Sequence, residues 1–258
     1  MIIIKAMLRT ILFLMLCIPS ILVRAEAPTD SIKALADSAY THEQYDRAIA
    51  LYTQLAEQGA SAVVYYNLGC AYYRKGDIAH SILWHERAAL LDPANADIAY
   101  NLQLLRDKTI DRIEPMHEFF LFQLWSDVVS LMCADAWAIL ALVCFSLALV
   151  MLALFMFSSR MPVRRMGLYV CILCVLLSVL GNVCAYQQHN KVMNRTSGVV
   201  VASSVTVKST PSEDGNDLFV IHEGTRLDVQ DDSMKEWAEI RISDGKVGWV
   251  QKKAFERI

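Results

Sequence analysis

The chain has 258 residues, a formal net charge of −3 at neutral pH and a hydrophobic content of 55%. This length allows one to three small domains. The weakly negative charge argues against a nucleic-acid partner, because nucleic-acid-binding proteins usually present a basic face. The hydrophobic content is high for a soluble protein, so long apolar segments are expected.

Residues 1–25 have the layout of a secretory signal peptide. Lys5 and Arg9 precede an apolar run that begins at Ile11 and ends at Val23. Small residues then occupy the positions that signal peptidase requires, which predicts cleavage near Ala25. The apolar run is short for a membrane span, and an uncleaved anchor is the alternative.

Residues 26–113 carry a two-helix pattern that occurs twice and then begins again. The triplet Tyr-Asn-Leu at residues 66–68 returns at residues 100–102, 34 positions later. Apolar residues recur at helical spacing, with polar breaks at His42 and Gly76. The expected helices lie within residues 32–40, 45–55, 63–91 (two helices around Gly76) and 95–113. The last of these would cover the exposed apolar face of the second unit.

This region resembles the tetratricopeptide repeat, whose period is 34 residues. The second unit matches the signature at Leu68, Gly69, Tyr72, Gly76, Ala88 and Pro93. The first unit is degenerate and has Ala36, Ala39 and Leu55 at three signature positions. Two repeats and a capping helix are close to the minimum that buries a continuous core.

The resemblance implies a concave groove that binds peptides or protein tails. The positions that match the groove of the family are Lys33, Asp37, Tyr40, Tyr66, Asn67, Tyr73, Arg74, Tyr100 and Asn101. Tetratricopeptide domains that clamp a C-terminal carboxylate use lysines, asparagines and an arginine. Only Lys33 and Asn67 match that set, and Asp37 and Asp97 stand where the clamp needs Asn and Lys. For each tyrosine, the alternative is a packing role alone.

The sequence contains two uncharged stretches of about 20 residues each, residues 136–157 and 166–186. A helix of that length crosses a hydrocarbon core of about 30 Å, so both stretches are predicted to be transmembrane helices. The intervening loop, residues 158–165, contains Arg160, Arg164 and Arg165 and no acidic residue. A short basic loop stays in the cytoplasm. We therefore expect a two-pass protein of the inner membrane, in contact with the lipid bilayer, whose N- and C-terminal domains both lie in the periplasm.

The segment before the first span, residues 114–135, is rich in aromatic residues. Phe119, Phe120, Phe122 and Trp125 lie close together just ahead of the predicted bilayer. Aromatic side chains prefer the headgroup interface, which suggests an amphipathic juxtamembrane linker. The alternative is an apolar segment that packs beneath the repeats.

After a polar linker over residues 187–197, the hydrophobic period changes to two. Five short strands separated by turn residues predict a small closed barrel over residues 198–258. The pattern resembles a bacterial SH3-type domain, and Gly248, Trp249, Phe255 and Ile258 carry much of the likeness. This family binds peptidoglycan or protein. We expect Trp249 in the core and assign Trp237 to the binding surface.

No catalytic, cofactor-binding or metal-binding constellation is apparent, so we do not expect an enzyme or a cofactor. Cys171 and Cys174 form a C-x-x-C motif, but they lie inside a predicted span without a charge that would lower a thiol pKa. His80 and His85 are five residues apart and point to different helix faces. A membrane thiol oxidoreductase that uses Cys171 and Cys174 is a third functional hypothesis, and it is weaker than the two given below.

The order of the parts, from signal peptide through repeats, aromatic linker and two spans to the SH3-type domain, resembles BatE, the tetratricopeptide family of the Bacteroides aerotolerance (Bat) group. The fold class expected is a multi-domain membrane protein with α-helical repeats, a transmembrane hairpin and a small all-β SH3-like barrel. The resemblance implies work with Bat proteins that carry von Willebrand A-type domains, and a link to a MoxR-type ATPase.

The function expected from this resemblance is a non-catalytic scaffold for envelope stress tolerance or aerotolerance. It would present two protein-binding modules to the periplasm. The alternative is a peptidoglycan-binding envelope protein that recruits a cell-wall enzyme.

Overall fold

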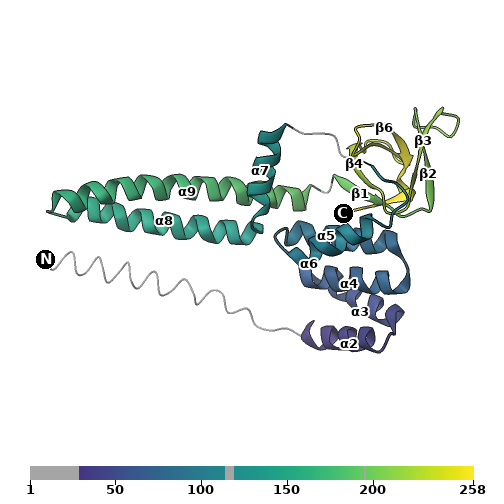
Figure 1. Ribbon diagram of the computed structural model, residues 1–258, viewed down its shortest axis with the longest axis horizontal. Helices are drawn as coiled ribbons and strands as arrows, with labels where there is room; N and C mark the ends of the chain where they lie inside the picture. Colours follow the sequence, from purple (N-terminus) through teal and green to yellow (C-terminus); the bar gives the residue numbers. More distant parts are fainter. Residues whose placement is uncertain (1–28, 114–118, 195) are drawn as a thin grey trace.

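The structure is a computed structural model that describes residues 29–113, 119–194 and 196–258 (Figure 1). These residues form a stack of short helices, a long helical hairpin and a β-domain. The expected signal peptide lies outside the described residues, and so does the start of the aromatic linker.

The helical stack contains five helices, each packed on the next. They are α2 (Thr29–Thr41), α3 (Tyr45–Gln58), α4 (Ala62–Lys75), α5 (Ile78–Leu91) and α6 (Ala96–Arg106). Gly76 ends α4 in the left-handed conformation with φ of 91°, which glycine adopts at little cost. Asp77 then caps α5 by accepting a hydrogen bond from the backbone N–H of His80.

The prediction that the last helix continues to Ile113 is wrong, because α6 ends at Arg106. Residues 107–113, which we call the strap, leave the helix and run along the β-domain. The contacts that Asp111 and Ile113 make there replace the helical hydrogen bonds.

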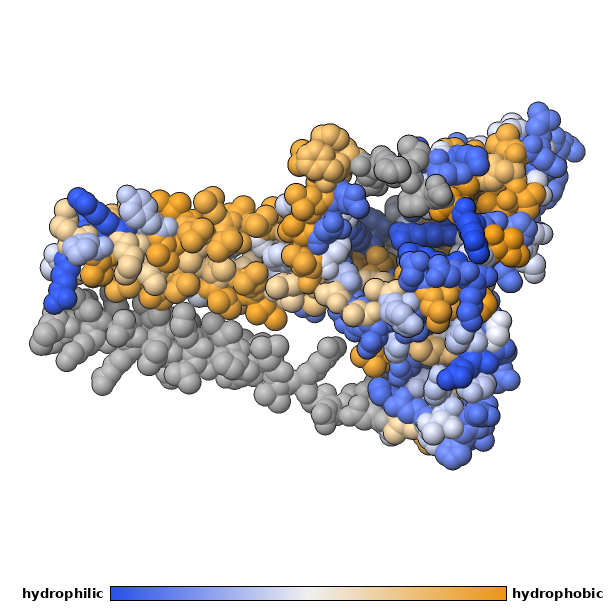
Figure 2. All heavy atoms as spheres, in the orientation of Figure 1, coloured by the Kyte–Doolittle hydropathy of each residue, from blue (hydrophilic) through white to orange (hydrophobic). Residues whose placement is uncertain are grey.

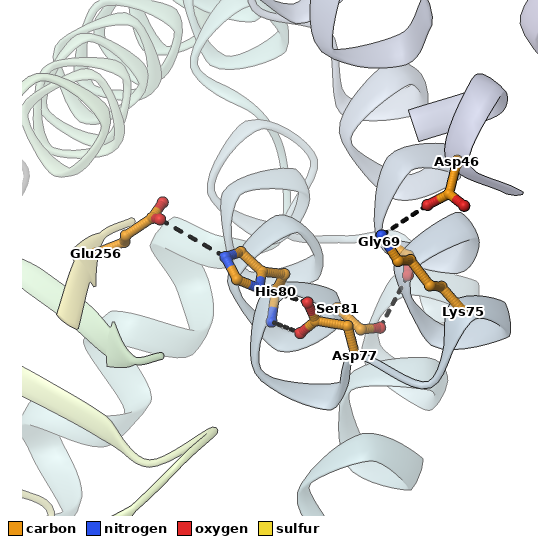
Figure 3. Close-up of polar contacts among 7 residues, drawn as sticks. All are labelled: Asp46, Gly69, Lys75, Asp77, His80, Ser81 and Glu256. Carbon is orange, nitrogen blue, oxygen red and sulfur yellow. Dashed lines mark hydrogen bonds and ion pairs between the residues drawn. The ribbon is translucent and has the colours of Figure 1, made fainter. Parts of the chain in front are cut away.

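The second helix pair packs closely because Gly69 has no side chain. A Cβ atom at Gly69 would lie 2.4 Å from Nδ1 of the buried His85. The Ser81 hydroxyl donates to the Gly69 carbonyl at 2.9 Å and joins α5 to α4 (Figure 3). Glycine in α4 therefore sets the spacing of the two helices.

The hairpin consists of α8 (Ala134–Phe157) and α9 (Met161–Met193), preceded by the short helix α7 (Phe120–Ser130). Both long helices have the length and composition of membrane spans, and most of their surface is exposed. Figure 2 shows hydrophobic flanks along the hairpin and hydrophilic atoms at the end far from the other domains. The arginine-containing connection between α8 and α9 lies at that end.

The helix α9 is longer than the expected span, and it includes residues that were assigned to the loops on both sides. It begins at Met161, with Pro162 in its first turn, where a missing backbone N–H costs nothing. At the other end it continues through most of the segment expected to be a polar linker, because no glycine or proline interrupts residues 187–193. Gln188 in this extension donates to the Leu90 carbonyl at 3.2 Å and joins the hairpin to α5.

Small residues bring α8 and α9 together. A Cβ atom at Gly181 would lie 3.1 Å from the Cβ of Ala141, and one at Gly167 would lie 3.2 Å from the Met151 carbonyl oxygen. The Ser178 hydroxyl donates to the Ala141 carbonyl at 2.9 Å. Close backbone approach of this kind is typical of helix pairs that associate in a membrane.

The β-domain is one antiparallel sheet of seven strands in the order β3-β2-β6-β5-β4-β1-β7. The strands are β1 (Ser197–Val200), β2 (Ser204–Lys208), β3 (Asp217–His222), β4 (Arg226–Asp231), β5 (Trp237–Ile242), β6 (Val247–Gln251) and β7 (Phe255–Arg257). The five predicted strands correspond to β2–β6, and β1 and β7 were missed. Every strand contributes buried residues to one apolar core, which includes Val207, Ile240 and Val250.

The repeats and the β-domain pack directly on each other, and we call the two together the head. Ile82 and Leu83 of α5 form one buried cluster with Val199 of β1. The buried carboxylate of Glu86 accepts from Arg106 of α6 at 2.5 Å and from Arg226 of β4 at 3.3 Å. The two modules are therefore joined by apolar and charged contacts.

The strap supplies the second part of this interface. The Asp111 carboxylate accepts from the His222 backbone N–H at 2.6 Å and from the Thr225 hydroxyl at 2.6 Å, and it lies 2.8 Å from His222 Nδ1. Ile113 packs against the β-domain core. Gly224, at φ of 83°, lies so close to the strap that a Cβ atom would be 2.8 Å from Thr109.

Candidate peptide-binding groove

The nine predicted groove residues lie on α2, α4 and α6, the first helices of successive units. Lys33, Asp37 and Tyr40 belong to α2, Tyr66, Asn67, Tyr73 and Arg74 to α4, and Tyr100 and Asn101 to α6. Residues 34 or 35 positions apart meet across neighbouring helices, because the repeat places equivalent residues side by side. The recurrence of Tyr-Asn-Leu therefore follows from equivalent packing positions.

Three hydrogen bonds at this spacing run across the helices. Asn101 Nδ2 donates to the Tyr66 hydroxyl at 2.9 Å, and Arg74 Nε donates to the Tyr40 hydroxyl at 3.4 Å. Lys108 Nζ donates to the Tyr73 hydroxyl at 2.5 Å and lies 4.6 Å from the centre of that ring. Lys108 was missed by the sequence analysis, although its position 35 residues after Tyr73 could have indicated it.

A cavity of about 250 Å³ lies between α4 and α6. Its wall includes Tyr66 and Asn67 from the predicted set. It also includes residues that the prediction did not contain, namely Ala62, Val63, Asp92, Asn95, Asp97 and Ile98. Amide, hydroxyl and carboxylate groups around a small apolar floor can hydrogen-bond an extended peptide and accept one of its side chains.

At the other end of the groove, Asp37 is the centre of a small polar network. Lys33 Nζ donates to Asp37 at 2.8 Å and the Tyr52 hydroxyl donates to it at 2.5 Å. Partial burial opposes ionisation, but these two hydrogen bonds hold the pKa of Asp37 below its usual range. The carboxylate therefore stays charged at neutral pH, and its charge is paired with that of Lys33.

The predicted residues differ in how far they are available to a ligand. Tyr100 is 71% exposed, whereas Tyr66 is half-buried and its ring lies edge-on to the buried His85. Burial lowers the pKa of His85, so its ring is neutral at neutral pH. Tyr100 and the exposed guanidinium of Arg74 offer the most accessible surface, and Tyr66 also supports the packing.

On the β-domain, Trp237 and Trp249 lie on the same outer face of the sheet. Trp237 pairs with Gln251 and Glu239 pairs with Trp249, while the alternating residues Ala238 and Val250 point into the core. Trp249 is only half-buried and lies outside the core cluster, contrary to our expectation of a core position. The two tryptophans thus occupy diagonal positions on the same face of β5 and β6.

Several polar groups of the head form ion pairs with one another. Within the described ranges, no three His, Cys, Asp or Glu side chains are grouped so that they could hold a metal ion. His80 contacts Asp77 at 2.7 Å and Glu256 of β7 at 3.6 Å, and Lys75 contacts Asp46 at 2.7 Å (Figure 3). The His80–Asp77 contact lies at the start of α5, His80–Glu256 joins α5 to the β-domain, and Lys75–Asp46 joins α4 to α3.

Comparisons with known proteins agree with the class of the C-terminal domain. Residues 203–256 match the family described as bacterial SH3 domain. Among solved structures, the chain is similar to the Sgt2 TPR domain from Aspergillus fumigatus, with 16% sequence identity and a TM-score of 0.30, over 76% of this chain and 93% of that chain. The comparison with curated proteins gives no match. The chain thus combines a helical repeat region, two apolar helices and a C-terminal all-β domain that matches the bacterial SH3 family.

Proposed function

We propose that this protein is a non-catalytic adaptor of the inner membrane that presents its groove and its SH3 domain to the periplasm as one rigid head. The observation that carries the proposal is the position of the head at one end of an apolar hairpin, with the basic connection at the other end. The positive-inside rule assigns that connection to the cytoplasm and the head to the periplasm.

The class of partner follows from the groove: it is an extended segment of another protein. An extended chain can use the Asn67 amide and the Asp97 carboxylate, which line the cavity between α4 and α6. The resemblance to BatE suggests von Willebrand A-type membrane proteins of the Bat group as partners, in envelope stress tolerance or aerotolerance.

The test is in-cell crosslinking of the tagged full-length protein, followed by purification in mild detergent and mass spectrometry. The groove variant combines Arg74→Ala with Tyr100→Ala, because both side chains are exposed. The matched control combines Arg47→Ala with Gln54→Ala, which removes an arginine and a long side chain from exposed positions on α3. We expect recovery of the partner to fall by about tenfold in the groove variant, as for a moderate hot spot, and to stay unchanged in the control.

Recovery of von Willebrand A-type proteins with this dependence supports the Bat-type scaffold. Equal recovery with both variants would contradict binding in the groove. Failure to extract the protein with the membrane fraction would contradict the membrane hairpin itself.

A second function, peptidoglycan binding that recruits a cell-wall enzyme, is favoured by Trp237 and Trp249, two partly exposed aromatic residues on the same face of the sheet. Aromatic rings on an exposed sheet can stack on sugar or peptide groups. The test is co-sedimentation of the detergent-solubilised protein with isolated sacculi. This function is supported if the protein sediments with sacculi and Trp237→Ala abolishes the sedimentation. The control Val247→Ala, on the same face of the sheet, should leave sedimentation unchanged. Absence of sedimentation contradicts it.

A further inference from the structure

The short helix α7 is attached to the hairpin by its C-terminal half. Val129 is fully buried against Trp137 and Cys184. The Trp137 indole N–H donates to the Val129 carbonyl at 3.0 Å, and the Trp125 indole N–H donates to the Gln187 amide oxygen at 2.8 Å. These contacts fix α7 at the end of the hairpin that adjoins the head.

The N-terminal half of α7 carries a group of exposed apolar side chains, which we call the aromatic tip. It consists of Phe119 (59% exposed), Phe120 (65%), Leu121 (52%), Phe122 (69%) and Leu124 (57%). The ring of Phe119 contacts those of Phe120 and Phe122, at centre distances of 5.0 and 6.2 Å. Figure 2 shows these hydrophobic atoms projecting beside the hairpin.

The level at which α7 is attached matches the edge of the apolar part of the hairpin. Its partner Gln187 directly follows the uncharged stretch of α9 that ends at Tyr186. Figure 1 shows α7 crossing the direction of α8 and α9 instead of continuing it. If the hairpin crosses a bilayer, α7 lies along the bilayer surface at the border of the hydrocarbon core.

The chemistry of the aromatic tip fits lipid better than a protein groove. Residues 119–122 are apolar without interruption, so successive side chains point to all sides of the helix. A protein surface would cover one side only, whereas the lipid interface surrounds the tip. Phenylalanine and tryptophan side chains on a short helix are typical of segments that lie in this interface.

We propose that α7 is an in-plane anchor, and that its aromatic tip is inserted among the lipids of the outer leaflet beside the hairpin. This inference rests on the proposed transmembrane hairpin. The anchor attaches the chain to the membrane at a second point, away from the hairpin axis. It therefore limits rotation of the hairpin, and of the head that Gln188 joins to it.

The test uses the full-length protein in phospholipid vesicles with a photo-crosslinking phenylalanine analogue at one position at a time. The analogue replaces Phe122 in the aromatic tip, Phe145 in α8, which is 52% exposed, or Tyr100 in α6, which is 71% exposed. All three positions are exposed aromatic residues, so the substitution is mild. Lipid adducts are measured by mass spectrometry after illumination.

We expect lipid adducts at position 122 in a yield similar to that at position 145, and about tenfold above that at position 100, since only the first two would contact lipid. Adducts at 145 without adducts at 122 overturn the anchor and leave the hairpin intact. Absence of lipid adducts at both 122 and 145 overturns the proposed membrane hairpin and the anchor with it. Crosslinks from 122 to the head of the same chain also overturn the anchor.

Discussion

Replacement of Asp111 by alanine should loosen the contact between the strap and the β-domain. The carboxylate accepts hydrogen bonds from the His222 N–H and the Thr225 hydroxyl and contacts His222 Nδ1, and its side chain is only 15% exposed. Each of the three partly shielded hydrogen bonds contributes roughly 1 kcal/mol, so the substitution should lower the free energy of opening this contact by about 3 kcal/mol. Thr225 is buried, so its hydroxyl would have no solvent to replace the lost acceptor.

Hydrogen exchange of the backbone amide of Gly224 measures this loss. That amide donates to the Val200 carbonyl, a bond that the substitution leaves in place, and Gly224 lies against the strap. A destabilisation of about 3 kcal/mol corresponds to an increase of about two orders of magnitude in the exchange rate, if exchange occurs by local opening. The protein is kept at full length in detergent or lipid, and peptides that cover the turn after β3 are followed by mass spectrometry.

The matched control is Asp107→Ala. Asp107 is an exposed strap residue whose side chain accepts only a hydrogen bond from Gln103 at 3.1 Å among the contacts described here. We expect its effect on Gly224 exchange to stay below about 0.5 kcal/mol. If Asp111→Ala changes the exchange of Gly224 by less than about threefold, the apolar contacts alone hold the interface and the reasoning from hydrogen bonds is refuted.

Further predictions concern acid stability and close packing. Burial raises the pKa of Asp111, but the hydrogen bonds from Thr225 and His222 outweigh it and hold the pKa below the usual 3.8. The stabilisation from this carboxylate is therefore complete above about pH 4 and is lost as the pH falls through the lower folded-state pKa, so the exchange rates of the wild type and Asp111→Ala should converge in acid. Gly69→Ala should destabilise the repeats by about 2 kcal/mol in thermal unfolding, because the added Cβ atom would lie 2.4 Å from the His85 ring and this overlap outweighs the gain in helix propensity. The control Gly59→Ala should be nearly neutral, since a Cβ atom there has no neighbour within 4 Å. Gly181→Leu should force α8 and α9 apart and lower the thermal stability of the hairpin in detergent, and an unchanged melting temperature would contradict the close packing.

The repeat helices could be predicted from the sequence because their determinants are local. Gly76 and Asp77 end one helix and begin the next within two residues, and the 34-residue period indicates which residues share a face. The same period predicted that Tyr66 and Asn101 lie on one surface. It did not predict that Asn101 hydrogen-bonds Tyr66, because that depends on side-chain conformations.

The parts that were missed depend on contacts between distant residues. Strands β1 and β7 have only four and three residues, and they pair with each other across more than fifty residues of chain. Too few residues are present for an alternating pattern to be recognised. Likewise, nothing near Asp111 in the sequence indicates that His222, 111 residues later, will contact its carboxylate.

The packed head determines how the two proposed binding surfaces could cooperate. If a flexible tether joined them, the groove and the β-domain would each raise the effective concentration of a shared partner at the other, over a range of distances. Here Glu86 bridges Arg106 and Arg226, and the strap closes over the turn after β3, so the spacing of the two surfaces is fixed. A partner must then match that spacing, which favours one assembled complex over a variety of unrelated ligands. Asp111→Ala should therefore lower the affinity for a partner that binds both surfaces and leave unchanged the affinity for a partner that binds the groove alone. The effect of this substitution on affinity therefore distinguishes binding at both surfaces from binding at the groove alone.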